Sequence, residues 1–188
     1  MNEKDFLYGC HSGIQKAIRR SDLDLAKTCF DAMWQEKEHR NWLKWRTTIL
    51  AEEDCWQMLG ELAIFYSSKP GDDEVAWRRM LYQLALVDKS KDTESLMFLA
   101  QMPAHETEIE EHPEMKDMRA WLARIGKDDP SSVAEELWEY ANDGLSDYEK
   151  AAARLLKSRL YQGGMLADRL ACLGGVLLIK HRGLKLEE

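Results

Sequence analysis

Clusters of carboxylates and histidines are the residues in this sequence that could do chemistry. The segment HETEIEEH places His105 and His112 on either side of four glutamates, and such ligands can hold a divalent cation. The segment lies between Pro103 and Pro113, where a short loop gives these side chains no defined geometry. We therefore favour a solvated acidic loop over a metal site.

A second carboxylate pattern consists of Glu136 and Glu139, which have the spacing E-x-x-E. A magnesium-dependent all-α nucleotide hydrolase needs this pattern to face an E-x-x-D on another helix, because several carboxylates must share the metal. No E-x-x-D follows at a suitable interval. This function remains an alternative, and it requires Glu136, Glu139 and Asp143 to converge on a pocket.

Motifs of other enzyme classes are absent from the sequence. There is no G-x-x-x-x-G-K-[ST] phosphate loop, no G-x-S-x-G nucleophile turn and no H-E-x-x-H zinc pattern. We expect a protein that is not an enzyme and that carries neither a cofactor nor a metal ion.

The stretch EHRNWLKWRTT combines basic and aromatic residues in a way that suits recognition. On a helix, Arg40 and Lys44 lie one turn apart on one face, together with Thr47 or Thr48, while the tryptophans favour another face. The basic strip could contact phosphate or an acidic partner, but we favour the interpretation that it is the solvated rim of a tryptophan core. The candidate binding residues of the whole chain are Arg19, Arg20, Arg40, Lys44, Arg46, Lys89 and Lys91.

The net charge of −8 is unevenly distributed along the chain. Residues 103–150 contain 14 of the 34 acidic residues but only 5 of the 26 basic ones. Because phosphate contacts need clustered positive charge, direct nucleic-acid binding is left to weak local patches. The acidic region supports another alternative, an inhibitory or DNA-mimicking protein that binds a basic partner.

Length and composition bound the remaining possibilities. A chain of 188 residues with 45% hydrophobic content can form one compact domain or two helical lobes without disulfides. No apolar run is long enough to span a bilayer, and the first residues are acidic where a signal peptide would be basic. We therefore expect a soluble cytoplasmic protein without a membrane segment. The four cysteines are far apart in sequence and are expected to be buried, reduced thiols.

Apolar residues at spacings of three and four run through almost the whole chain, which predicts an all-α multi-helix bundle of antiparallel helix pairs. The first helix is expected over residues 4–20. Ser21 is expected to cap the second helix, with Asp24 completing a capping box. Further helices are expected over 39–66, with a break near 52–54, over 73–87 and over 92–102.

The second half of the chain has its own helix-start signals. Ser132 with Glu135, and Ser146 with Glu149, have the spacing of capping boxes. A last helix of high apolar density covers residues 165–183 and should be buried. We divide the chain into a helical lobe over 1–102, an acidic linker bracketed by prolines over 103–113, and a second helical lobe over 114–188 packed on the first.

Three blocks, KAIRRSDLDLA, KWRTTILAEED and LALVDKSKD, follow one another in the first half of the chain. In this order they resemble segments of the C-terminal domain of the RarA/MgsA-type replication-associated recombination ATPases, which are related to clamp loaders. The first family segment reads Lys-Ser-Ile-Arg-Gly-Ser-Asp-x-Asp-Ala-Ala. The resemblance covers residues 6–102 and rests on Lys16, Ile18, Arg19, Ser21, Asp22, Asp24, Ala26, Arg46, Ala51, Glu53, Asp54, Leu86, Lys89 and Ser90.

The resemblance implies a clamp-loader-collar-like domain that forms a homo-oligomer or contacts an ATPase of a replication or repair complex. Trp45, Glu52 and Asp88 depart from the family pattern, and the phosphate loop of the motor is missing. Seven tryptophans and nine methionines suit an interaction surface. The sequence therefore predicts a non-catalytic helical assembly or adaptor protein of DNA replication or repair, and leaves a phage or mobile-element origin open.

Overall fold

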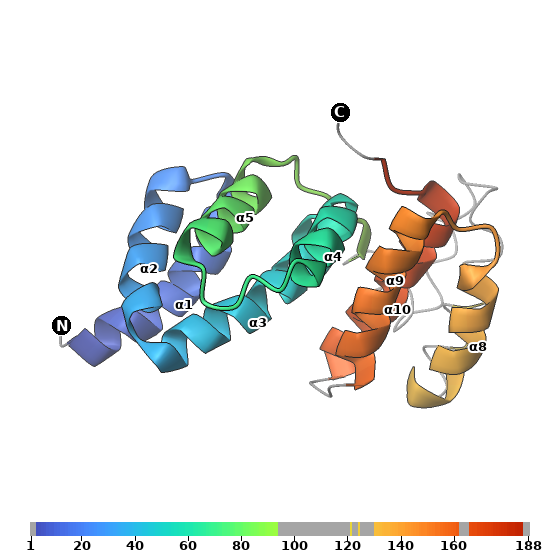
Figure 1. The fold of residues 1–188 in the computed structure, drawn as a ribbon. Helices are drawn as coiled ribbons and strands as arrows, with labels where there is room; N and C mark the ends of the chain where they lie inside the picture. Colours follow the sequence, from blue (N-terminus) through green and yellow to red (C-terminus); the bar gives the residue numbers. More distant parts are fainter. Residues whose placement is uncertain (1–2, 94–120, 122–123, 125–129, 162–165, 186–188) are drawn as a thin grey trace.

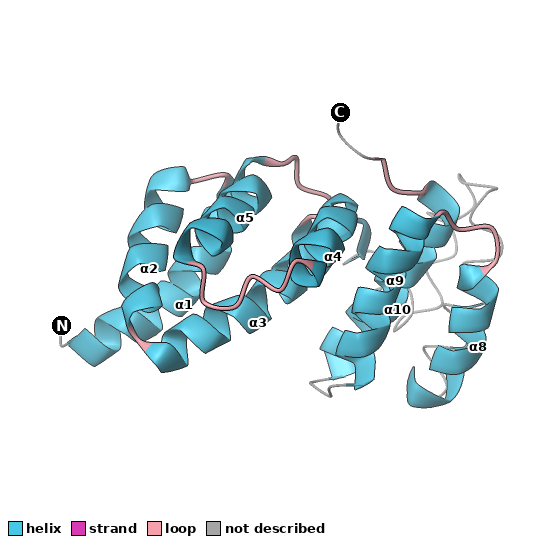
Figure 2. Cartoon of the chain, viewed as in Figure 1, coloured by secondary structure: helices cyan, strands magenta, loops and turns pink. Residues whose placement is uncertain are grey.

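The protein is an all-α multi-helix bundle, as predicted. The computed structural model describes residues 3–93, 121, 124, 130–161 and 166–185, and these residues contain eight α-helices, one 3-10 helix and no strand (Figures 1 and 2). The elements are α1 (Glu3–Arg20), α2 (Leu23–Gln35), α3 (Lys37–Asp54), η1 (Trp56–Met58), α4 (Leu59–Ser67), α5 (Glu74–Leu86), α8 (Pro130–Asn142), α9 (Asp147–Tyr161) and α10 (Leu166–Arg182).

The turn between α1 and α2 corrects the predicted cap. Ser21 has a φ of 55° and lies just beyond the end of α1, where its N–H donates to Ile18 O at 3.2 Å. The N–H of Asp22 donates to Ala17 O at 2.9 Å, which completes a Schellman motif. Asp22, not Ser21, caps α2 by accepting a hydrogen bond from the N–H of Leu25 at 3.0 Å. Ser21 cannot do both, because its left-handed backbone is already used to end α1.

The long segment after α2 is interrupted where the sequence predicted a break. Helix α3 ends at Asp54, η1 turns the chain, and α4 continues from Leu59. Helix α5 begins after Asp73, whose carboxylate accepts from the N–H of Ala76 at 3.1 Å. Trp77, Leu81 and Leu84 of α5 are buried in the core. Of the helix predicted over 92–102, residues 94–102 lie outside the described residues, as does the linker at 103–113.

Helices α8, α9 and α10 pack beside one another in the second half of the fold (Figure 1). The predicted capping box at α9 is confirmed, since Ser146 N donates to Glu149 at 2.9 Å and Glu149 N donates to Ser146 Oγ at 3.3 Å. The predicted start of α8 at Ser132 is wrong. The helix begins at Pro130, because a proline in the first turn lacks only an N–H that has no helical partner there.

The two halves share one hydrophobic core, which contains residues of α1–α5 and of α8–α10. Helix α4 packs on α9, and α10 packs on α3 as well as on α8 and α9. The contacts of α10 on two sides explain why residues 170–179 are all buried. All four cysteines are buried and free, as predicted. No helix of the described residues combines the length and hydropathy needed to cross a membrane.

Candidate functional site

Arg40 and Lys44 hold the turn before α5 against α3. Arg40 donates to Trp34 O at 2.9 Å and lies 3.4 Å from a carboxylate oxygen of Asp72. Lys44 donates to Gly71 O at 2.6 Å and also bonds Asp72. These cations lower the pKa of the Asp72 carboxyl, with the hydrogen bond from Lys44 as the largest cause.

The predicted continuation of this basic strip is wrong. Thr47 and Thr48 are buried, whereas Trp45, which was assigned to the core face, is exposed. Thr47 Oγ1 donates to Leu43 O at 2.8 Å, and Thr48 shares a 2.9 Å hydrogen bond with Tyr66. The reason is that α3 contacts α2, α4, α5 and α10, so more than one of its faces is covered.

Arg19 and Arg46 neutralise the acidic end of α3. Arg19 Nε donates to both oxygens of Asp54, at 3.1 and 2.9 Å, and its Nη2 donates to Glu53 at 3.0 Å. Arg46 Nη2 donates to Glu53 at 3.0 Å and to Gln15 at 3.0 Å. Two carboxylates at a helix C-terminus are unfavourable with the helix dipole, so the arginines stabilise this end of α3.

Of the three remaining predicted basic residues, Lys89 and Lys91 lie in the segment after α5. Lys89 donates to Leu84 O at 2.8 Å and Ala85 O at 3.1 Å, which caps the end of α5. Ser90 N donates to Asp54 O at 2.9 Å, and Lys91 Nζ lies 3.9 Å from Asp54 Oδ1. Arg20 is exposed at the end of α1.

The structure brings the three blocks of the family resemblance together around Asp54. Arg19 comes from the first block, Arg46 and Glu53 from the second, and Ser90 from the third. Six of the seven predicted binding residues have partners within this chain. To contact phosphate they would have to give up these partners, so the geometry supports a structural role for them.

A buried carboxyl lies behind this cluster. Glu52 of α3 is almost fully buried, and Cys172 of α10 lies within hydrogen-bond reach, with Sγ 3.5 Å from Glu52 Oε1. Burial raises the pKa of Glu52 to about 8, and the charge of Arg159 opposes this only in part. The second oxygen, Oε2, has no hydrogen-bond partner among the described residues. Sequence reasoning singled out Glu52 only as a departure from the family pattern.

The carboxylates proposed for a metal-dependent hydrolase do not converge. Glu136 is exposed and paired with Arg124 at 2.7 Å, and Glu139 and Asp143 are exposed as well. Within the described ranges, no group of three histidine, cysteine or acidic side chains is arranged to hold a metal ion. His105 and His112 lie outside the described residues.

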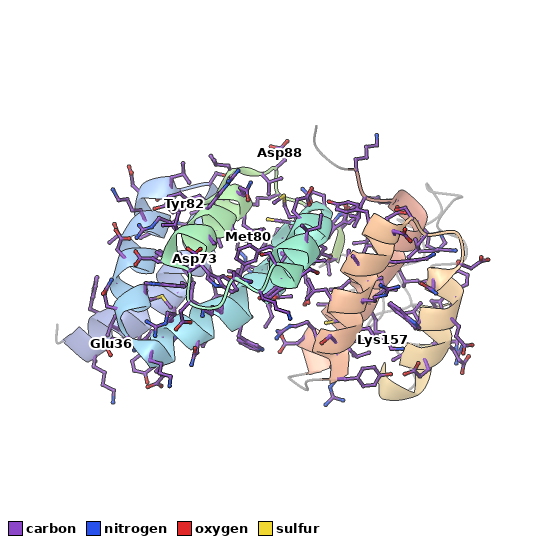
Figure 3. All side chains as sticks on the ribbon, in the orientation of Figure 1. Glu36, Asp73, Met80, Tyr82, Asp88 and Lys157 are labelled. Carbon is purple, nitrogen blue, oxygen red and sulfur yellow. The ribbon has the colours of Figure 1, made fainter. Side chains whose placement is uncertain are left out.

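An open groove between α4 and α5 is the feature that sequence reasoning missed. It consists of two adjoining hollows of about 640 and 500 Å³, and Glu61 and Gln83 border both. Ile64, Val75 and Leu86 line it and are 53, 76 and 63% exposed. Figure 3 shows Met80 between the two helices, with Asp73 and Asp88 beyond the two ends of α5. The one indication in the sequence was that Val75 and Leu86 are apolar but lie off the face of α5 that carries its other apolar residues.

Comparison with known protein families, curated proteins and solved structures finds no match to this chain.

Proposed function

We propose that this protein is a non-catalytic helical adaptor that docks a partner protein in the α4/α5 groove. The groove supports this because large apolar side chains are rarely left in one open concave surface without a binding role. Ile64, Val75 and Leu86 are three of the seven large apolar side chains that the described residues expose. This concentration in one groove is the observation that carries the proposal.

The polar clusters support a scaffold role for the rest of the molecule. Arg19, Arg46 and Lys89 each hold the end of a helix or join one segment to another. A side chain held in this way is poorly placed to bind and release a substrate. The scaffold can instead keep α4 and α5 at a constant separation, which a docking groove requires.

The biological setting that we propose is DNA replication or repair. The support is the resemblance of three blocks to the collar-like domain of clamp-loader-related ATPases, and these blocks meet at Asp54. The partner in this proposal is a replication or repair ATPase, or further copies of the chain in a homo-oligomer.

The test is light scattering coupled to size exclusion, on the protein alone and mixed with a purified clamp-loader-type ATPase, at low and high salt. We expect a defined oligomer or complex that is lost in Ile64→Gln and Leu86→Gln. The control is Phe6→Gln, which changes an exposed apolar residue of α1 outside the groove and should leave assembly intact. Assembly that is unaffected by both groove substitutions, or nucleotide hydrolysis by the purified chain, would overturn the proposal.

A further inference from the structure

The polar groups of the groove carry information about its occupant. Glu61 Oε2 and Gln57 Oε1 are buried atoms that have no hydrogen-bond partner among the described residues. The amide nitrogen of Gln57 donates to Asp88 O at 2.6 Å, which fixes the orientation of the amide and leaves its oxygen as an acceptor. Both orphaned groups are therefore acceptors, and a partner's donor can satisfy Glu61 once that side chain turns toward the open groove.

The charge of the groove also favours a partner that supplies positively charged donors. Among the described residues that line it are three carboxylates, Glu61, Asp73 and Asp88, against one cation, Arg79. Glu61 lies where the two hollows meet, so its negative charge is central rather than at the rim. A partner that places a positive group over Glu61 would gain both charge complementarity and a hydrogen bond.

The shape of the groove suits a helix. Helix α4, of nine residues, and α5, of thirteen, form its long walls, and η1 and the segment after α5 line one end, so its length corresponds to two to four helical turns. Apolar side chains at both ends of the groove, Ile64 and Val75 at one end and Leu86 at the other, can receive a stripe of apolar residues spaced three and four apart.

We propose that the groove binds an amphipathic α-helix of a partner protein that places an arginine or lysine over Glu61 and Gln57 and apolar residues against Ile64, Met80 and Leu86. This inference rests on the docking function proposed above and names the partner's chemistry. A second copy of the chain is a poorer match, because each copy carries a net charge of −8.

The test uses two designed helical peptides with the same leucine stripe, one with lysine and arginine on its polar face and one with glutamate there. Binding is measured by fluorescence anisotropy at low and high salt. We expect the basic peptide to bind, its affinity to fall with salt, and the acidic peptide to bind at least tenfold more weakly, by roughly the strength of a charged hydrogen bond. Glu61→Gln should weaken the basic peptide by about tenfold.

The matched control is Glu139→Gln, which removes one exposed carboxylate on α8 and changes the net charge equally. Equal loss of affinity for the basic peptide in Glu61→Gln and Glu139→Gln, with binding abolished in Leu86→Gln, would show that the groove docks the helix but that Glu61 does not recognise its basic group. If Leu86→Gln has no effect, the groove is not the docking site and the proposed function falls with it. If the protein alone forms a dimer that Leu86→Gln disrupts, the groove binds a second copy of the chain, and the proposed basic helix is wrong.

Discussion

At the scale of single residues, Glu52 is the side chain whose state depends most on the fold. It lies on α3 against Cys172 of α10, and the charges of Arg159, Asp168 and Glu53 act on it. Its pKa is raised from 4.5 to about 8, chiefly because burial disfavours the charged carboxylate. At neutral pH the folded protein therefore holds a proton on Glu52 that the unfolded chain releases.

This difference predicts a pH-dependent free energy of unfolding. Since the folded-state pKa is the higher one, the contribution is fully present below pH 4.5 and is lost as the pH rises toward 8. Between these values the loss from this group is roughly 1 kcal/mol per pH unit. Glu52→Gln, which cannot ionise, should remove that part of the slope. Urea denaturation of both proteins at several pH values between 5 and 8 would measure this difference in slope.

The comparison is made between variants because other groups titrate in the same range. Burial lowers the pKa of His11, and the neighbouring positive charge of His39 lowers it further. Glu139→Gln, at an exposed site, should keep the wild-type slope. A slope that is the same in Glu52→Gln and in the wild type would show that Glu52 ionises normally in the folded protein.

At the scale of the elements, the ends of α1 and α2 show how closely two helices can be joined. Ser21 supplies the left-handed residue that ends α1, and Asp22 caps α2 directly afterwards. A left-handed backbone is strained for a residue with a Cβ atom and is natural for glycine. The joint is therefore tight but carries a local cost at Ser21.

Ser21→Gly should relieve this strain. We expect the free energy of unfolding to rise by about 0.5 kcal/mol, since glycine removes the backbone strain but also gains freedom in the unfolded chain. Ser21→Ala keeps the strained backbone and should give no gain. The midpoint of urea unfolding measures both variants. Equal stability of the glycine and alanine variants would show that the strain at this position is negligible.

At the scale of the whole molecule, the contact between the two halves depends on close packing at Gly60. A Cβ atom on Gly60 of α4 would overlap the ring of Tyr148 on α9. Gly175 of α10 allows a close approach within the second half, because its Cβ atom would lie 2.8 Å from Cδ1 of Leu156 on α9. The two halves pack closely at Gly60 because glycine there leaves room for the ring of Tyr148.

Gly60→Ala should therefore distort the contact of α4 with α9, with a loss of roughly 1 to 3 kcal/mol in the free energy of unfolding that depends on how far the Tyr148 ring shifts. The control is Gly9→Ala in α1, where the added Cβ atom meets nothing within 4 Å and should stabilise the helix slightly. Thermal and urea unfolding would compare the two.

Removing the opposing ring provides a second check on this packing. Tyr148→Ala in the Gly60→Ala background should restore part of the lost stability, because the added methyl group then has room. Strictly additive effects of the two substitutions would mean that Gly60 and Tyr148 do not share one contact.

Much of the local structure could be predicted from the sequence. Apolar spacing predicted the helices, and the Ser146–Glu149 spacing predicted a cap that the hydrogen bonds confirm. Local signals failed where two roles competed for one residue, as at Ser21, or where a proline could start a helix earlier, as at Pro130. Helix ends depend on residues within one or two turns, so the chemistry that decides them is present in the local sequence even where the prediction chose the wrong residue.

The candidate site could be predicted only in part. Arg19, Arg46 and Lys89 were predicted as binding residues, but their hydrogen bonds within the chain depend on where the fold places Asp54, Glu53 and the end of α5. The groove was missed because an apolar residue such as Leu86 looks the same in sequence whether a neighbouring helix covers it or not.

The sequence alone determined an all-α fold, several helix ends and the absence of common enzyme motifs. Only the tertiary structure decided that Thr47 and Thr48 are buried, that Glu52 is enclosed with Cys172, and that α4 and α5 leave a groove open. The physical reason is range. Helix formation depends on residues three and four apart, whereas burial and charge state depend on which distant helix lies against each face.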